Sequence, residues 1–454
     1  MMSFHHPEKH RSSNKTAEDE LPKPWRASSR KALFPFVIFV AFYFGFAFAT
    51  KDFYKVPMTI AFLLSSAAAL CLNHQESLHR KMELFALGMG HRDIMIMCLV
   101  FICAGAFTAT AKAIGGVEAA VSLAQHWIPS SFMLSGFFMI ACFISLAIGT
   151  SCGTIAAMVP IAVSLSQNMG FSSSLFIGAV VGGSMFGDNL SLISDTTIAA
   201  TRTQGVEMRD KMLYNLKIVL LPALVCVFVY ALPIFSHTAH APIESSLSAE
   251  IFVKTSTYFL LLFLGIFGIN VLFLLFLGTI LNTLIGLYYG TFSLLDAFSI
   301  IGKGTEEMTT TILVSLLAGG LLVLIRYNGG VAYILQITHR WIRNRRTCEL
   351  GICFLTGVMN LLTANNTIAI ITSGALAKEL GHHYGVNPKR TASLLDTSSC
   401  IVQGMIPYGA QILIATSLSE SIHLSAFDIL QGCFYPPIMA LGVLGSIWFT
   451  NRRR

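Results

Sequence analysis

Runs of apolar residues recur along almost the whole chain, from residue 33 to residue 450, and short polar stretches separate them. An α-helix needs about 20 apolar residues to cross a lipid bilayer, and most of the runs approach that length. Four polar stretches differ from the rest because they interrupt apolar segments instead of joining them. They are GTSCGT (149–154), GDNLSLISDTT (187–197), LTANNT (362–367) and QGMIPYGAQ (403–411). The pattern predicts an all-α integral membrane protein with polar breaks inside some of its helices.

The second half of the chain repeats the first at a spacing of 214 residues. Residues 88–127 align with residues 302–341, and the spacing holds for pairs such as Gly105 with Gly319 and Trp127 with Trp341. With small slips the register continues, so that GTIAAMVPIAVSL (153–165) matches NTIAIITSGALAKEL (366–380). We therefore divide the chain into an N-terminal tail, a first transmembrane unit and a second unit, at residues 1–32, 33–250 and 251–454.

The basic residues predict that the two units have opposite orientations, because Lys and Arg are retained on the cytoplasmic side of a membrane. The connection at 202–217 is basic, whereas its counterpart at 416–427 contains no Lys or Arg. Conversely, 125–131 contains neither, whereas its counterpart at 339–347 contains four Arg. Each connection thus changes side between the units. This indicates an inverted-topology repeat, which is typical of secondary transporters, with both termini on the cytoplasmic side of the plasma (bacterial inner) membrane.

Following the apolar runs between these sides gives about ten transmembrane helices, two re-entrant hairpins and two broken helices. Residues 132–167 form the first hairpin around GTSCGT, with two full crossings as the alternative, and residues 171–202 form the first broken helix. The second unit repeats the pattern from 253 to 450. The remaining crossings of the first unit are expected at 33–50, 56–73, 94–111 and 213–235.

The composition agrees with a membrane protein, since 54% of the residues are hydrophobic, 12% are charged and the mean hydropathy is +0.68. The net charge of +7 does not indicate nucleic-acid binding, because the basic residues cluster beside apolar runs. Residues 1–32 are polar and are expected to form a disordered cytoplasmic tail without a cleavable signal peptide. The ten cysteines mostly lie in apolar runs without a CxxC pair, which favours packing over zinc or disulfide roles.

The four breaks form the candidate site. Inverted symmetry allows them to meet near the membrane midplane, where non-helical backbone is tolerated if it lines a cavity and can bind ions or small polar solutes. A carboxylate there costs about 2.5–3.5 kcal/mol, so Asp188, Asp195 and Asp396 are functional candidates. Desolvation favours a protonated acid and a bound cation favours a carboxylate, so Na⁺ and H⁺ would compete at Asp188 and Asp195. Hydroxyl and amide oxygens are the hard ligands that Na⁺ prefers; the candidates are Ser151, Thr154, Asn189, Ser191, Ser194, Thr196, Asn365, Asn366 and Thr367.

Each acid also has a structural interpretation. Asp195 would pair with a neighbouring hydroxyl or backbone N–H at the helix break. Asp188 would cap the half-helix that follows it, since Asp and Asn are common N-cap residues. Asp396 would likewise be a cap or a structural hydrogen-bonding residue.

The motif FGDNLSLISDTT (186–197), together with GTSCGT and the series TANNT, LLDTSS and IPYGA, resembles the NhaC family of sodium/proton antiporters. The resemblance covers residues 33–450. It implies an ion transporter with paired re-entrant hairpins and an elevator-like movement of the hairpin domain, and one departure is Leu192, where the family often has Pro. It assigns the family's ion motif to Asp188, Asn189, Ser191, Asp195 and Thr196.

We therefore expect a secondary active antiporter that exchanges Na⁺ for H⁺. Family members are also described as malate/lactate exchangers or amino-acid carriers, so the alternative is a Na⁺- or H⁺-coupled carrier of a small organic solute. A channel would use polar breaks as well, but duplicated hairpins favour alternating access. We expect no enzymatic activity, because the sequence contains no HExxH motif or comparable catalytic set, and no cofactor besides the transported ions. The expected partner is the lipid bilayer, and a homodimer is one assembly that the sequence allows.

Overall fold

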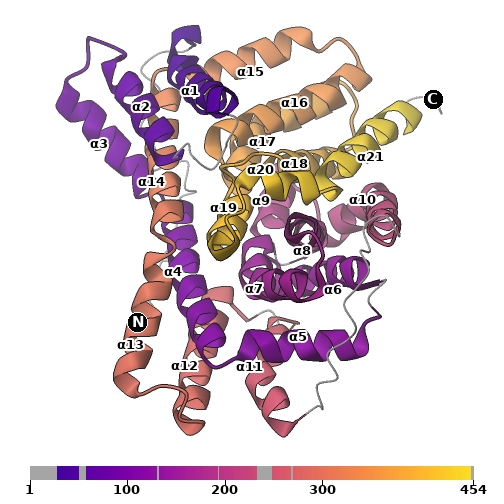
Figure 1. The fold of residues 1–454 in the computed structure, drawn as a ribbon. Helices are drawn as coiled ribbons and strands as arrows, with labels where there is room; N and C mark the ends of the chain where they lie inside the picture. The colour runs from indigo at the N-terminus through magenta and orange to yellow at the C-terminus, as the bar shows by residue number, and fades with distance from the viewer. Residues whose placement is uncertain are drawn as a thin grey trace, which may run out of the picture.

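The computed structural model describes residues 28–50, 58–129, 132–192, 194–232, 248–266 and 269–450. Every regular element among these residues is a helix, which confirms the predicted all-α fold class (Figure 1). Most of the predicted N-terminal tail, residues 1–27, lies outside the described residues. Its last part differs from the expected disorder, because Arg30–Leu33 form a 3-10 helix (η1).

The helices fall into two series with the same order. The first series comprises α1 (Phe34–Thr50), α2 (Met58–Cys71), α3 (Leu78–Met89), α4 (Arg92–Ala113), α5 (Gly116–Trp127), α6 (Met133–Ile148), α7 (Ser151–Met169), α8 (Ser173–Leu190), α9 (Asp195–Gln204) and α10 (Met208–Tyr230). The second comprises α11 (Ala249–Ile266), α12 (Val271–Tyr288), α13 (Leu294–Glu306), α14 (Thr309–Tyr327), α15 (Gly330–Trp341), α16 (Arg345–Thr363), α17 (Asn366–His383), α18 (Pro388–Gln403), α19 (Ala410–Leu418), η4 (Glu420–Ile422), α20 (Ala426–Gly432) and α21 (Tyr435–Thr450). The helices α5 and α15 begin 214 residues apart and also end 214 residues apart (330 minus 116, 341 minus 127).

One pair of counterparts differs in shape. The first series ends with the single helix α10, whereas the second ends with α20 and α21, which are bent by 53° relative to each other. The bend precedes Pro436, the counterpart of Pro222 within α10. A proline removes one backbone donor and disfavours helical conformation in the residue before it. The consecutive prolines at 436 and 437 therefore interrupt a helix more readily than the single Pro222 does.

Contacts between the two series come in symmetric pairs, in which each helix and its counterpart change places. The helix α3 packs on α14, and its counterpart α13 packs on α4. In both places glycines bring two backbones together, Gly88 against Gly319 and Gly105 against Gly304, with no room for a side chain. Figure 1 shows counterparts at opposite ends of the molecule, with α15 and α16 at the top and α5 and α6 at the bottom. This is the arrangement of an inverted repeat.

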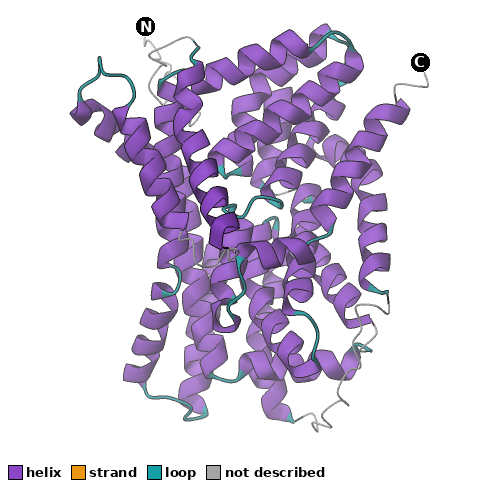
Figure 2. Ribbon diagram, turned by 45° about the horizontal axis from the view of Figure 1, so that its top comes forward, coloured by secondary structure: helices purple, strands orange, loops and turns teal. Residues whose placement is uncertain are grey.

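The helices form two groups. In the first group α4 packs on α12, α13 and α14, and α14 packs on α2 and α3. The second group combines the hairpins and broken helices of both series, since α9 packs on α17 and α18, and α19 packs on α7. The helices α5 and α15 connect the two groups. Figure 2 shows loops inside the helical body as well as at its ends, and these inner loops include the breaks that form the site.

Fewer helices than predicted have the length and composition of a complete membrane crossing. Within the described ranges five qualify, namely α4, the α8–α9 segment, α10, α12 and α14, and the bent pair α20–α21 makes six. The other predicted crossings fall on α1, α2, α11 and the α18–α19 pair. For example, α2 has 14 residues, and at about 1.5 Å per residue such a helix is shorter than a hydrocarbon core of about 30 Å.

Candidate functional site

The two hairpin tips have the same backbone conformation. In the first tip Gly149 has φ 77° and Thr150 is extended with φ −150°; in the second tip Ala364 has φ 49° and Asn365 is extended with φ −142°. The left-handed conformation of Gly149 and Ala364 ends the incoming helix. The backbone N–H of each residue still donates to the carbonyl four residues earlier, Ser145 in one tip and Asn360 in the other. The extended residue then places α7 and α17 in the opposite direction.

The first broken helix is interrupted where predicted, since α8 ends at Leu190 and α9 begins at Asp195, although Leu192 replaces the family's frequent Pro. Ser191 and Ser194 have extended backbones, with ψ 140° and ψ 137°. The last carbonyls of a helix need other partners, and α10 supplies two for Asn189. Its carbonyl oxygen accepts from Lys211 Nζ at 2.7 Å and from Asn215 Nδ2 at 3.0 Å. The break is therefore stabilised by side chains from a neighbouring helix.

All four breaks meet at one cavity of about 190 Å³. The tip of the first hairpin, the break between α8 and α9, the tip of the second hairpin and the break between α18 and α19 each contribute lining residues, and α4 and the start of α12 complete the wall. The charged side chains among the described lining residues are the two acids Asp188 and Asp195. The cavity is thus acidic, with apolar side chains of α4 and α12 in part of its wall, and it is formed by elements from both repeats.

Of the twelve residues predicted for the site, the cavity brings eight together: Ser151, Asp188, Ser194, Asp195, Thr196, Asn365, Asn366 and Thr367. The other four lie outside its lining: Thr154, Asn189, Ser191 and Asp396. Thr154 is buried within α7, where its hydroxyl donates to the Thr150 carbonyl at 3.0 Å. Asn189 supports the break through its carbonyl, as described above.

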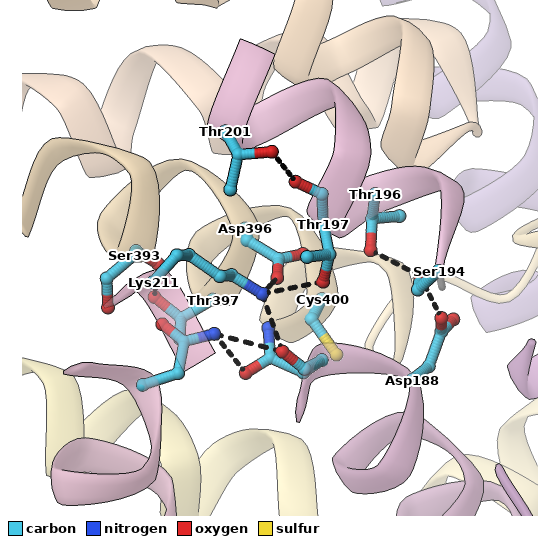
Figure 3. A network of polar contacts seen from close by, with 12 residues as sticks. Asp188, Ser194, Thr196, Thr197, Thr201, Lys211, Ser393, Asp396, Thr397 and Cys400 are labelled. Carbon is cyan, nitrogen blue, oxygen red and sulfur yellow. Dashed lines mark hydrogen bonds and ion pairs between the residues drawn. The ribbon is translucent and has the colours of Figure 1, made fainter. Parts of the chain in front are cut away.

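Asp188 is the buried acid of the cavity, with 8% of its surface exposed. Its Oδ2 accepts from the Ser151 hydroxyl at 2.7 Å, and its Oδ1 accepts from the Ser194 hydroxyl at 2.5 Å. Ser194 Oγ in turn lies 2.9 Å from Thr196 Oγ1 (Figure 3). Asp188 lies within α8, and the residue that caps α9 is Ser194, so the N-cap interpretation of Asp188 is wrong.

Two glutamines connect this carboxylate to the second hairpin. Gln411 Nε2 donates to Ser151 Oγ at 2.9 Å, and Gln411 Oε1 accepts from Gln403 Nε2 at 2.9 Å. Gln403 Nε2 also donates to the Ala364 carbonyl at 3.0 Å. A continuous chain of hydrogen bonds therefore runs from the second hairpin tip through the second break to Ser151 and Asp188. It links all four breaks.

Asp396 forms a buried ion pair with Lys211 beside the cavity (Figure 3). The side chains are 1% and 0% exposed. Lys211 Nζ also donates to Thr197 Oγ1 at 2.8 Å and to the Asn189 carbonyl. Asp396 lies within α18 and caps no helix. The lysine is held by groups from α8, α9 and α18, so it joins the first break to a helix of the second repeat.

Asp195 differs from Asp188 in its exposure. It is the first residue of α9, its side chain is exposed and it lines the cavity. A carboxylate in the first turn of a helix is stabilised by the helix dipole. The two acids of one motif thus occupy different environments, one buried between hydroxyls and one open to the cavity.

The prediction from sequence missed Gln403, Gln411 and Lys211. The glutamines were visible as part of the polar stretch at 403–411, but nothing in one stretch indicates which residues face the partner repeat. Lys211 was assigned to a basic connection, whereas α10 begins three residues before it and buries it. Its partner lies 185 positions away in sequence, so no local signal could identify the pair.

A model of the Na⁺/H⁺ antiporter family matches the chain twice, over residues 26–232 and 229–446. The Malate-2H(+)/Na(+)-lactate antiporter of Bacillus subtilis is 26% identical over 176 residues, which cover 39% of this chain and 38% of that relative. The Na(+)/H(+) antiporter NhaC of the same organism is 21% identical over 411 residues, covering 84% of this chain and 89% of the relative. The YdaH transporter of Alcanivorax borkumensis is similar with a TM-score of 0.44 and 13% identity, over 91% of this chain and 97% of that one.

The matches to the family model fall on the two helix series, one match on each, and together they span almost all of the described residues. The chain belongs to the Na⁺/H⁺ antiporter family.

Proposed function

We propose that this protein is a secondary active Na⁺/H⁺ antiporter whose exchanging group is the Asp188 carboxyl. The observation that carries the proposal is the position of this acid. It is buried in a cavity lined by all four breaks, and both of its oxygens accept hydrogen bonds from hydroxyls. Placing an acid at such a position costs free energy, and acids found there are functional candidates by default.

The surroundings of Asp188 suit a cation and a proton alternately. When the Ser151 and Ser194 hydroxyls donate to the carboxylate, each oxygen keeps one lone pair beyond the one that faces Gln411 or Thr196, so a Na⁺ ion can bind carboxylate and hydroxyl oxygens together. When a proton binds instead, one carboxyl oxygen becomes a donor and the adjacent hydroxyl turns to accept from it. Because the carboxyl group neutralises one positive charge at a time, Na⁺ and H⁺ displace each other.

Asp195 would attract cations to the cavity. Its side chain is exposed and lines the same cavity, and charges of one sign in a cleft raise the local concentration of counter-ions. We assign to Asp195 the capture of Na⁺ and not its exchange for H⁺. The charged form of an exposed carboxylate keeps more of its hydration than the charged form of the buried Asp188 does.

We further propose that the protein lies in the plasma membrane with both termini on the cytoplasmic side. The positions of α5 and α15 support this orientation. The helices α5 and α15 lie at opposite ends of the molecule in Figure 1, and their last residues, Trp127 and Trp341, are 71% and 69% exposed. Exposed Trp is typical of both membrane–water interfaces, and the Arg residues after Trp341 mark the cytoplasmic one.

A coupled carrier of a small organic solute is the second candidate, and the size of the cavity favours it. A single water occupies about 10–15 Å³ by a water-sized probe, so a cavity of about 190 Å³ has room for more than a bare ion. A relative with partial coverage is named for malate, Na⁺ and lactate.

The two candidates differ in what drives proton movement. The purified chain would be reconstituted into vesicles that contain a pH-sensitive dye, and NaCl or choline chloride would be added outside. An antiporter alkalinises the lumen with Na⁺ alone. Proton flux that appears only when an organic acid or amino acid is also present would overturn the proposal in favour of the coupled carrier.

A further inference from the structure

Gln403 occupies a position in the cavity wall that the exchange at Asp188 does not explain. It is the last residue of α18, it is 1% exposed, and it lines the cavity. Both hydrogens of its amide are committed, since Nε2 donates to the Ala364 carbonyl and to Gln411 Oε1. A backbone carbonyl can only accept, so the amide nitrogen must face Ala364 and the orientation of the whole group follows.

The oxygen of the same amide has no partner. Gln403 Oε1 is buried and accepts no hydrogen bond from the described residues. A buried acceptor without a donor is costly, and natural proteins satisfy most such groups. Rotating the amide by half a turn would not help, because Oε1 would then face the Ala364 carbonyl and Gln411 Oε1, and two oxygens would repel each other.

We infer that Gln403 Oε1 is a cation ligand contributed by the second repeat, an inference that rests on the proposed Na⁺ exchange. The first repeat supplies the charge at Asp188, and the second repeat supplies a neutral hard oxygen from another residue that lines the same cavity. Amide oxygens are common ligands for hard cations. The hydrogen bonds to Ala364 and Gln411 hold this oxygen in place before the ion arrives, which lowers the cost of binding.

A purely structural role would explain the two hydrogen bonds of Gln403 Nε2 but not the unpartnered Oε1. Gln403 connects the second hairpin tip to Gln411, and that link uses Nε2 alone. Gln411 makes an equivalent link, but both of its amide atoms have partners, Ser151 and Gln403. Substituting Gln411 therefore breaks the link without removing an unpartnered oxygen, which makes it the matched control.

The test measures Na⁺ binding to the purified full-length chain through its melting temperature. NaCl replaces choline chloride at constant ionic strength, and a ligand that binds the folded state raises the melting temperature with concentration. We expect Gln403→Leu to raise the Na⁺ concentration of half-maximal stabilisation about tenfold, the usual effect of losing one interaction with a charged group. Gln403→Glu restores an oxygen but donates at most one hydrogen bond, and only when its carboxyl is protonated, so it should recover part of the Na⁺ binding that Gln403→Leu loses. Gln411→Leu should shift the response less than Gln403→Leu.

A Gln204→Leu variant serves as the outer control, because Gln204 is buried and donates to the Gly374 carbonyl away from the cavity lining. If Gln403→Leu is not monodisperse, Gln403→Asn takes its place, since the shorter side chain withdraws the same oxygen. Equal shifts for Gln403→Leu and Gln411→Leu, without recovery in Gln403→Glu, would overturn the inference and leave the proposed function intact. If the melting temperature of the wild type were the same in NaCl and in choline chloride, that result would contradict both the proposed Na⁺ site and the inference.

Discussion

At Lys211 the three donors of one ammonium group meet three acceptors: the Asn189 carbonyl, the Thr197 hydroxyl and the Asp396 carboxylate. A cation near the last carbonyls of a helix is also favoured by the helix dipole, and Asn189 is the penultimate residue of α8. The lysine therefore holds the end of α8 and the start of α9 at a fixed distance from α18.

The ion pair at Lys211 predicts a strong dependence of stability on both partners. Removing one partner of a buried pair typically costs about 3–5 kcal/mol, whereas replacing both by apolar residues is often far less harmful. We expect Lys211→Met to lower the melting temperature in detergent sharply and Lys211→Met with Asp396→Leu to recover much of the loss. A double variant whose loss equals the sum of the two single losses would contradict the pairing.

A second prediction at this scale concerns Ser151, whose hydroxyl donates to Asp188 and accepts from Gln411. Ser151→Ala removes both bonds and one oxygen next to the carboxylate. We expect the Na⁺ concentration of half-maximal exchange to rise about ten- to a hundredfold, since hydrogen bonds to charged groups contribute about 1.5–3 kcal/mol. The control is Ser166→Ala, because Ser166 is buried in α7 outside the cavity lining. Equal effects of the two substitutions would refute the role of Ser151.

Sequence reasoning found the acids of the site because an acid inside an apolar stretch is visible without a structure. It could not rank them. Asp188 and Asp195 belong to one motif, and only the fold buries the first between Ser151 and Ser194 while it leaves the second exposed. Likewise, the partner that neutralises Asp396 comes from another helix of the opposite repeat, and no spacing rule connects the two positions.

Among the elements, the hairpin tips show how one backbone shape is made by two sequences. Gly149 adopts the left-handed conformation without strain, whereas Ala364 adopts it at a cost of about 1–2 kcal/mol for a residue with a Cβ atom. Strained residues of this kind concentrate at functional sites. Here the Ala364 carbonyl is an acceptor for Gln403 at the cavity.

The tips predict opposite effects for opposite substitutions. Gly149→Ala should lower the free energy of unfolding by about 1–2 kcal/mol, because it introduces the strain that Ala364 already bears. Ala364→Gly should be neutral or stabilising by up to about 1 kcal/mol, since relief of strain is offset by the greater freedom of glycine in the unfolded chain. Melting temperatures of the two variants in the same detergent provide the measurement. A stabilised Gly149→Ala variant would show that the tip is not left-handed.

The breaks could be predicted because glycine, proline and polar residues accumulate there, and the structure interrupts α8 and α18 at those places. The short helices α5 and α15 were not predicted. Each mixes apolar and polar residues over 12 positions, so a search for long apolar runs passes over them. The end of α2 was predicted two residues too late, since the helix ends at Cys71 and the expected segment ran to residue 73.

For the whole molecule, the inverted arrangement of the two helix series predicts which loops lie on the same side of the membrane. Single cysteines on a cysteine-free background would be placed at Glu207, Asn344 and His126, all of which are exposed. Glu207→Cys and Asn344→Cys should react with an impermeant reagent from the cytoplasmic side, and His126→Cys from the other. Labelling of Glu207→Cys and Asn344→Cys from opposite sides would contradict the inverted orientation of the repeats.

The central claim is that the two repeats enclose one buried carboxyl group, Asp188, which binds Na⁺ and H⁺ in turn. The most direct measurement compares Na⁺-driven proton flux in vesicles for the wild type, Asp188→Asn and Asp195→Asn at equal protein density. We predict that Asp188→Asn reduces the flux at least about a hundredfold, equivalent to about 2.7 kcal/mol, while Asp195→Asn still exchanges with a higher half-saturating Na⁺ concentration. Exchange by Asp188→Asn at the wild-type rate would contradict the account.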